Sequence, residues 1–519
     1  RRTRPGAQIL RHRQSAPHHP RSLPHEHSLP RDPHHRWLVP HLAEKSERVI
    51  TKSKGVPHHE FQTRISVLLS DHARELFRLY QGHTACKRQS TNQSGTARRN
   101  QRRASALGSG SCHRPAPPTP YLRHYDAPAD AQKYFDYITD TYSEYDAEKE
   151  LTVEEAEEDV NYLFDAFYYD FAFYDYFGGH TVFDQTKAEI LQELQAKDNL
   201  TCKDLQEVLV KHLTFIKDGH FNINHNFPAE KEIPFFFRQV MFVKTDSGYQ
   251  NSKGKTVVSV DGHPDLDTLF KRSISQEGYL VYYPVLLKEA KFDGTEWDKH
   301  VCDEQLTVHY ADGSTDVLTA DTWSQYYKDL PKDQNTDLRQ TDGIPVFQFN
   351  SFEGSFLQEV NAAAAQMSDA AISMLDLRSN VGGYEEVAHQ WITRYSRQRV
   401  QGNGVRYDVV NPVSVAIQAH RWQTHDNILI LLSGKCSASS AEITMDLAYN
   451  LENSLIIGEN TNGCMIGNGG HVELPNSKCS VIMTSVCVYL LPEGADYFEE
   501  MRGLSPDIWV PAKEAETLA

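Results

Sequence analysis

The spacing of apolar residues divides the chain beyond about residue 121 into three stretches. Helical spacing dominates residues 121–228, where acidic and aromatic segments cover 130–145, 152–177, 185–197 and 202–216. Thr152 and Glu155 have the spacing of a capping box at the start of the second segment. These patterns predict a helical N-terminal domain.

The two later stretches have different periodicities. Residues 229–342 contain short apolar runs separated by turn signals such as Asp261-Gly262, which predicts a β-rich domain. From residue 343 to residue 519, continuous apolar runs alternate with amphipathic helices, which predicts an α/β domain with a mainly parallel sheet. Sites in such sheets form at the carboxyl ends of strands. Segments 375–383 and 435–443 both follow predicted strands, and we expect them to meet there.

The first 120 residues form a basic segment that differs from the rest of the chain. They contain 22 Lys and Arg against 7 Asp and Glu, whereas the remainder contains 31 against 63. They also hold 13 of the 25 histidines and many prolines, with little apolar periodicity. Such a composition predicts disorder, because too little apolar surface is available to offset the loss of chain entropy. One helical face is possible within residues 61–80.

Several roles remain open for residues 1–120. Their charge suits a nucleic-acid arm, but a dispensable extension, a targeting segment or sequence never selected to fold together explain them better. No ligand spacing indicates a metal site among their histidines. The acidic remainder does not favour nucleic acid as a partner. The chain contains no apolar run long enough to span a membrane and no signal peptide, so the sequence predicts no membrane span and no compartment.

Two segments carry candidate chemistry. In the serine-rich segment 435–443, Ser439 and Glu442 fit a capping box, and the start of the following helix also supplies free backbone N–H groups for an oxyanion. Residues 380–383 form a glycine turn whose backbone can approach a substrate carbonyl. Each segment also has a purely structural explanation. The nearest lysine to the serines is Lys435, and no histidine lies close by in sequence.

The order of four motifs resembles the S41 peptidases, the C-terminal-processing and tricorn-type serine proteases. The motifs are DLRSNVGG at 376–383, SASSAE at 437–442, GENTNG at 458–463 and RGLSPD at 502–507. The similarity covers roughly residues 345–512 and extends more thinly to 204–221. The resemblance implies a crotonase-like α/β core. It also implies that residues 229–342 lie where many members carry a PDZ-like domain, although they match that domain poorly.

The resemblance also implies roles for individual residues. Ser439 would be the nucleophile, with the Ser440 N–H and that of Gly382 or Gly383 forming the oxyanion hole. The lysine base of the processing proteases is replaced here by Cys464, and a buried thiol cannot perform the work of a neutral amine.

The tricorn-type branch offers another base. It uses a histidine before the core and a glutamate ahead of the last motif, which correspond to His220 and Glu500. The serine that precedes the histidine in that branch is Gly219 here, and Glu499 leaves the acid uncertain by one position.

The sequence therefore predicts a serine-type peptidase that hydrolyses peptide or unfolded protein substrates through an acyl-enzyme. His220 would take the serine proton, and Glu500 would fix or stabilise the imidazole. No cofactor is expected. No metal site is expected either, since His225 has no HExxH partner. The competing hypothesis is an inactive, peptide-binding relative that has lost the lysine. The sequence carries no signal for oligomeric state.

Overall fold

The computed structural model describes residues 143–519, except for 292–298, 329, 332–333, 401, 403–404, 409–425, 486 and 492–496. The segment 1–120, predicted to be disordered, lies outside the described residues, as does most of the predicted helix at 130–145. Within the described part, no helix combines the length and apolarity needed to cross a bilayer.

Three helices form the first described elements: α3 (Val153–Tyr169), α4 (Gly179–Gln195) and α5 (Cys202–His212). The predicted capping box is present at α3, where Thr152 Oγ1 accepts from the Glu155 N–H at 3.1 Å and Glu155 Oε2 accepts from the Thr152 N–H at 2.9 Å. The helix ends at Tyr169, although the sequence predicted helix to residue 177. Residues beyond it form turns that bury Phe171 and Phe173 together, which a single helical face does not allow.

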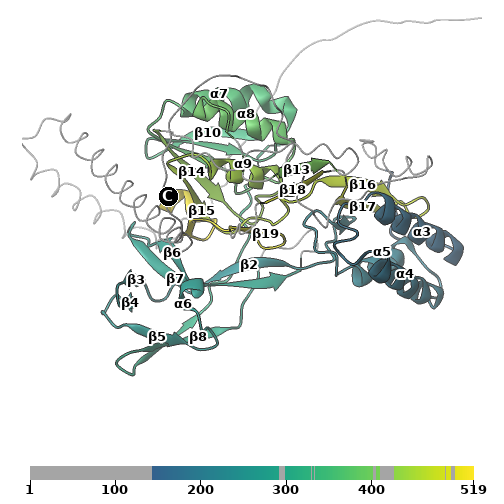
Figure 1. Cartoon of the computed structure of the whole chain (residues 1–519), viewed down its shortest axis with the longest axis horizontal. Helices are drawn as coiled ribbons and strands as arrows, with labels where there is room; N and C mark the ends of the chain where they lie inside the picture. Colours follow the sequence, from purple (N-terminus) through teal and green to yellow (C-terminus); the bar gives the residue numbers. More distant parts are fainter. Residues whose placement is uncertain are drawn as a thin grey trace, which may run out of the picture. The chain divides into compact units, whose positions relative to one another are not determined.

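The helices share a hydrophobic core with strands from the C-terminal part of the chain. Strands β1 (Asn222–Ile223), β17 (Ser480–Thr484) and β16 (Gly469–Glu473) form an antiparallel sheet in that order. One cluster of buried side chains joins α3, α4 and α5 to β16 and β17, and Figure 1 shows these elements together. The helical stretch therefore does not build its core alone, and β1 follows directly on the segment that carries His220.

The described part of the stretch predicted to be β-rich contains antiparallel strands and the small helix α6 (Leu266–Leu269). One sheet has the order β2-β7-β3-β4 with β6 beside β7, and a second sheet has the order β5-β8-β9. The strands are β2 (Lys231–Phe236), β3 (Phe242–Thr245), β4 (Gly248–Asn251), β5 (Val257–Val260), β6 (Phe270–Ile274), β7 (Leu280–Ala290), β8 (Gln305–Tyr310) and β9 (Thr315–Thr319). All of these pairings are antiparallel.

The C-terminal part contains a sheet of six strands in the order β10-β11-β12-β14-β15-β21. These are β10 (Thr336–Thr341), β11 (Ile344–Phe349), β12 (Ile372–Asp376), β14 (Ile428–Ser433), β15 (Ser454–Gly458) and β21 (Ile508–Trp509). The pairings from β11 to β21 are parallel, and only β10 runs antiparallel. The prediction of a mainly parallel sheet is confirmed. Strand β10 joins this sheet although its residues fall within the stretch predicted to be β-rich.

Helices cover the sheet with their apolar sides. The turn η2 (Gly354–Phe356), α7 (Leu357–Met367), α8 (Glu385–Ser396) and α9 (Ser440–Ala448) share one buried cluster with the strands. The short α10 (Ala515–Leu518) contributes to a second cluster that includes β12, β14 and β15. Figure 1 shows α7 and α8 side by side, with α9 close to β14. Two small ladders complete the described fold, β13 (Val405–Asp408) with β18 (Cys487–Leu490) and β19 (Phe498–Glu499) with β20 (Gly503–Leu504).

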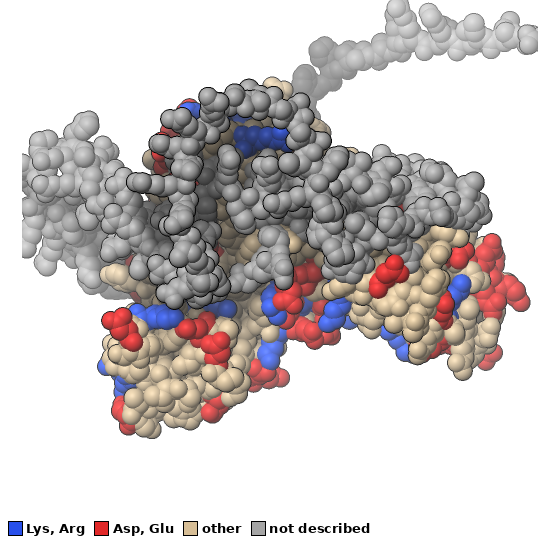
Figure 2. Space-filling model, in the orientation of Figure 1, with Lys and Arg blue, Asp and Glu red and all other residues tan. Residues whose placement is uncertain are grey.

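Charged side chains of both signs are interspersed on the described surface. On the face drawn in Figure 2, both acidic and basic side chains lie among the coloured residues, and acidic ones gather at the right-hand end. Mixed charge of this kind is ordinary for a solvent-exposed surface.

Candidate active site

Ser439 lies at the sharp turn between β14 and α9. Its backbone has φ 54° and ψ −116°, a region that L-residues with side chains rarely adopt. Every other residue from 429 to 448 is buried, and Ser439 is the one that is partly exposed. The strained turn thus presents this serine to solvent, and its neighbours stay in the core. Strain of this kind is concentrated at functional sites.

The buried Glu442 carboxylate stabilises the serine turn by accepting backbone hydrogen bonds. Its Oε2 accepts from the Ser439 N–H at 2.9 Å, which is the glutamate half of the predicted capping box. The same carboxylate accepts from the backbone N–H groups of Gly463 at 2.8 Å and Cys464 at 3.0 Å. One buried side chain therefore joins the serine segment to the loop of the third motif.

His220 reaches the serine from a segment far away in sequence. Its Nε2 lies 3.2 Å from Ser439 Oγ, within hydrogen-bond distance, although 219 positions separate the two residues. Only 13% of the His220 side chain is exposed. The segment is fixed by Asp218, whose Oδ1 accepts from the His220 N–H at 3.0 Å. The structure thus brings together two of the predicted site residues in the geometry that proton transfer requires.

Burial lowers the pKa of His220, since desolvation penalises the charged imidazolium. The carboxylates of Asp218 and Glu442 oppose this effect, and the Lys231 ammonium adds to it. The net direction is downward, which favours the neutral ring. A neutral imidazole is the form that can accept a proton from a serine hydroxyl.

Glu500 lies close to His220 but bonds to the backbone rather than to the ring. Its Oε1 accepts from the Gly219 N–H at 2.9 Å, and its Oε2 accepts from the Ile466 N–H at 3.3 Å. Burial, together with the nearby carboxylates, raises the pKa of Glu500 well above its usual range. Its neighbour Glu499 is exposed and pairs with Arg502, so Glu500 is the inward-facing member of the pair.

The glycine turn lies against the serine. A Cβ on Gly382 would be 2.8 Å from Ser439 Cβ, so the close approach requires glycine, and its φ is 97°. The Gly382 N–H donates to Asn380 Oδ1 at 2.8 Å and is therefore already engaged. Among the described residues, the N–H groups of Gly383 and Ser440 have no acceptor. Of the three predicted oxyanion donors, only these two are free.

Cys464 packs directly against Gly219, in the space that a side chain at position 219 would need. A Cβ on Gly219 would lie 2.1 Å from the Gly463 carbonyl oxygen and 2.5 Å from Cys464 Cβ. Burial raises the pKa of the Cys464 thiol well above its usual range, which makes it a poor base. The two departures from the resembled motifs are thus one structural feature, because the loop at 463–464 leaves no room for a serine at position 219.

We expect Gly219→Ala to destabilise the protein by about 1–3 kcal/mol, because the new methyl group must displace backbone atoms of the loop. The measurement is the thermal unfolding midpoint. Gly354→Ala is the matched control, since nothing lies within 4 Å of its Cβ position. A Gly219→Ala protein as stable as the wild type would contradict the close packing of the two segments.

Lys435, the lysine nearest to the serines in sequence, donates to backbone carbonyls and not to the Ser439 hydroxyl. Its Nζ donates to the Thr461 carbonyl at 2.7 Å and to the Arg502 carbonyl at 3.0 Å. Burial lowers the pKa of Lys435 to about 7. These hydrogen bonds hold the serine segment against the loop of the third motif. The side chain that lies within hydrogen-bond distance of the Ser439 hydroxyl is His220.

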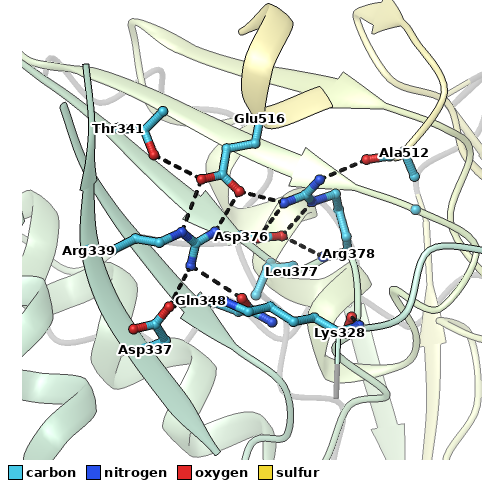
Figure 3. A network of polar contacts seen from close by, with 12 residues as sticks. Lys328, Asp337, Arg339, Thr341, Gln348, Asp376, Leu377, Arg378, Ala512 and Glu516 are labelled. Carbon is cyan, nitrogen blue, oxygen red and sulfur yellow. Dashed lines mark hydrogen bonds and ion pairs between the residues drawn. The ribbon is translucent and has the colours of Figure 1, made fainter. Parts of the chain in front are cut away.

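A buried ionic network supports the glycine turn from the end of β12. Arg378 donates to both carboxylate oxygens of Asp376, at 2.8 and 2.7 Å, and to Glu516 at 2.8 Å. Arg339 donates to the same two acids, at 3.1 Å and 2.6 Å. Figure 3 shows both carboxylates between the two guanidinium groups. Arg378 is only 2% exposed, so the motif that carries the glycines is anchored within the core.

Sequence reasoning missed several residues that shape the site. Asp218 and Lys231 lie next to the His220 segment, and Asn462 bonds to the serine segment. Asp218 could have been found, since it lies two residues before His220 within the segment 204–221 to which the resemblance extends. Lys231 lies outside the four motifs, and Asn462 lies inside the third motif without an assigned role. Among the described residues, no group of three or more His, Cys, Asp or Glu side chains is arranged to hold a metal ion.

Comparison with known proteins identifies one domain. Residues 343–510 match the sequence profile of peptidase family S41. This range contains the serine turn and the glycine turn but not His220. No curated protein sequence matches the chain.

Several solved structures are similar to the chain. One is mature CPAF in complex with lactacystin, at 12% identity and a TM-score of 0.40, over 70% of this chain and 96% of that one. The photosystem II D1 C-terminal processing protease has 14% identity and a TM-score of 0.33, over 69% and 94% of the two chains. The tricorn protease has 13% identity and a TM-score of 0.31, over 70% of this chain and 35% of that one. These similarities are low, and the family match is confined to residues 343–510.

Proposed function

We propose that this chain, which carries a peptidase S41 domain at residues 343–510, is a serine-type peptidase with Ser439 as its nucleophile and His220 as its base. The observation that carries the proposal is the 3.2 Å separation between Ser439 Oγ and His220 Nε2. It joins a strained, partly exposed serine to a histidine whose pKa is lowered by burial. Substrates would be peptides or unfolded proteins.

In the first step the Ser439 hydroxyl attacks the carbonyl carbon of the scissile peptide bond. Its proton moves to His220 Nε2, and the carbonyl oxygen takes up the negative charge of the tetrahedral intermediate. The free N–H groups of Gly383 and Ser440 would donate to that oxygen. Preorganised donors of this kind supply a large share of transition-state stabilisation in acyl transfer.

In the second step the intermediate collapses and the bond to nitrogen breaks. His220 returns its proton to the leaving amine, and an ester between Ser439 Oγ and the acyl group remains. Water then attacks this ester, with His220 again accepting the proton. Collapse of the second intermediate breaks the bond to Ser439 Oγ and releases a carboxylic acid, and His220 returns its proton to the Ser439 oxygen. No cofactor takes part.

Glu500 would act on the backbone that carries the base. Its carboxyl group accepts from the Gly219 N–H, and Gly219 immediately precedes His220. Glu500 therefore positions the histidine segment rather than the ring itself. This differs from a triad in which the acid contacts the imidazole directly. The finer assignments belong to the same proposal: a crotonase-like core, a tricorn-type site, and a divergent PDZ-like unit at residues 229–342.

The competing candidate is a peptide-binding relative without catalysis. The burial of Cys464 at the position of the lost lysine favours it. The two candidates differ in the reactivity of Ser439, because only a serine with a working base reacts quickly with an electrophilic probe.

A fluorophosphonate probe tests the proposal. We expect it to label the wild-type chain at Ser439, as identified by peptide mapping, and to leave Ser439→Ala unlabelled. Ser437→Ala is the matched control, because the Ser437 hydroxyl is buried and donates to the Leu377 carbonyl at 2.8 Å. An unlabelled, folded wild-type protein would favour the binding protein instead.

A further inference from the structure

We propose that Asp218 and Lys231 are positioning residues that set the charge balance around His220 through their opposite charges. Asp218 would stabilise the imidazolium formed during the reaction, and Lys231 would keep the resting ring neutral. The inference rests on the function proposed above, since it concerns the base of that site. The resemblance to the S41 peptidases assigned a role to neither residue.

The Asp218 carboxylate is held rigidly beside the ring. Its Oδ1 lies 4.0 Å from His220 Nδ1 and accepts from the His220 N–H at 3.0 Å. Thr484 donates to it twice, from its N–H at 2.9 Å and from its hydroxyl at 3.0 Å. The Asp218 side chain is 0% exposed. A carboxylate fixed at this distance favours a positive ring through space.

The Nδ1 atom of His220 is itself without a hydrogen-bond partner. It is buried, and among the described residues no donor or acceptor lies within hydrogen-bond distance. Glu500, the acid expected to contact the ring, instead accepts from backbone N–H groups with both of its carboxyl oxygens. Asp218 is therefore the acid whose charge faces the Nδ1 side of the imidazole.

Lys231 supplies a buried positive charge next to the segment that carries His220. It begins β2 and is only 2% exposed. Its Nζ donates to the Gly219 carbonyl at 2.9 Å and also to Asn462 Oδ1. Asn462 in turn donates from its Nδ2 to the Lys435 carbonyl at 3.1 Å. A continuous hydrogen-bonded path thus joins the segment of the base to the segment of the nucleophile.

The remaining ionisable groups around His220 come from three further elements. Glu442 of α9 is a carboxylate that favours the charged ring. Glu500 lies beyond Gly219, and burial raises its pKa well above the usual range. The Cys464 thiol, on the loop of the third motif, also has a raised pKa. Asp218 raises the pKa of His220 and Lys231 lowers it. Removing the two charges must therefore shift this pKa in opposite directions.

The experiment compares Asp218→Asn and Lys231→Gln with the wild type. The rate of fluorophosphonate labelling is measured against pH, because its acidic limb reports the pKa of the base in the free enzyme. We expect Asp218→Asn to move this limb down by about 1 pH unit and Lys231→Gln to move it up by about as much. Lys231→Arg retains the charge and should keep the wild-type limb. Lys244→Gln, an exposed lysine of β3 paired with Asp267, is the matched control.

A second measurement separates this inference from the proposed function. The pKa of the His220 ring is read directly by NMR in the Ser439→Ala background, with His220→Gln to assign the signal. Opposite shifts in the two variants support the inference even if the wild type shows no labelling. Equal pKa values, or shifts of the same sign, would overturn it. If Asp218→Asn does not fold, the upward shift in Lys231→Gln decides alone, and its absence overturns the inference.

Discussion

His220→Ala is expected to lower kcat/KM for peptide hydrolysis by about 10⁴-fold, the upper range for loss of a general base. The imidazole is the acceptor 3.2 Å from the Ser439 hydroxyl, and no second base in the described residues contacts that hydroxyl. The measurement uses a quenched fluorescent peptide that the wild-type enzyme cleaves. KM should change little, because the ring takes up a proton rather than holding the ground-state substrate.

His225→Asn is the matched control for this prediction. His225 is exposed, lies five positions further along the chain and has a φ of 64°, which asparagine tolerates. It should retain wild-type activity. If His220→Ala kept more than about a tenth of the wild-type rate, the histidine could not be the base, because general-base catalysis contributes at least about 10²-fold.

Arg378→Met is expected to lower the free energy of unfolding by about 3–5 kcal/mol, the usual cost of removing one partner from a buried ion pair. The substitution leaves the Asp376 carboxylate, only 1% exposed, with Arg339 as its remaining cation. It also removes the donor to the Ala512 carbonyl. The measurement is denaturant unfolding followed by intrinsic fluorescence.

Asp369→Ala provides the control for this second prediction. Asp369 pairs with Arg397, but the two side chains are 76% and 65% exposed. Solvent-exposed pairs contribute about 0–1 kcal/mol, so the control should be close to wild type. Equal effects of the two substitutions would show that the buried network does not anchor the motif.

Much of the fold could be predicted from periodicity. The apolar runs at 344–352, 370–379, 427–434 and 454–460 became β11, β12, β14 and β15, because strands buried on both faces need continuous apolar sequence. The end of α3 was harder to predict. The residues after Tyr169 remain aromatic, and only the packing of Phe171 and Phe173 decides that they turn.

The candidate site could be predicted in part. The motifs placed Ser439 and the glycine turn at the carboxyl ends of neighbouring strands, since parallel strands bring these ends to one edge of the sheet. They could not distinguish Gly382 from Gly383 as a donor. The distinction depends on Asn380, whose side chain engages the Gly382 N–H.

The sequence by itself determined the parallel sheet, the serine at a helix start and the loss of the lysine at Cys464, because periodicity and motif spacing are local properties. The resemblance already paired His220 with Ser439, and the tertiary structure added the 3.2 Å separation of their side chains. Only the tertiary structure decided that Glu500 bonds to the Gly219 backbone and that Asp218 and Lys231 lie beside the segment of the base. These contacts join residues more than 200 positions apart, or depend on which atom a buried side chain reaches, and no local pattern encodes either.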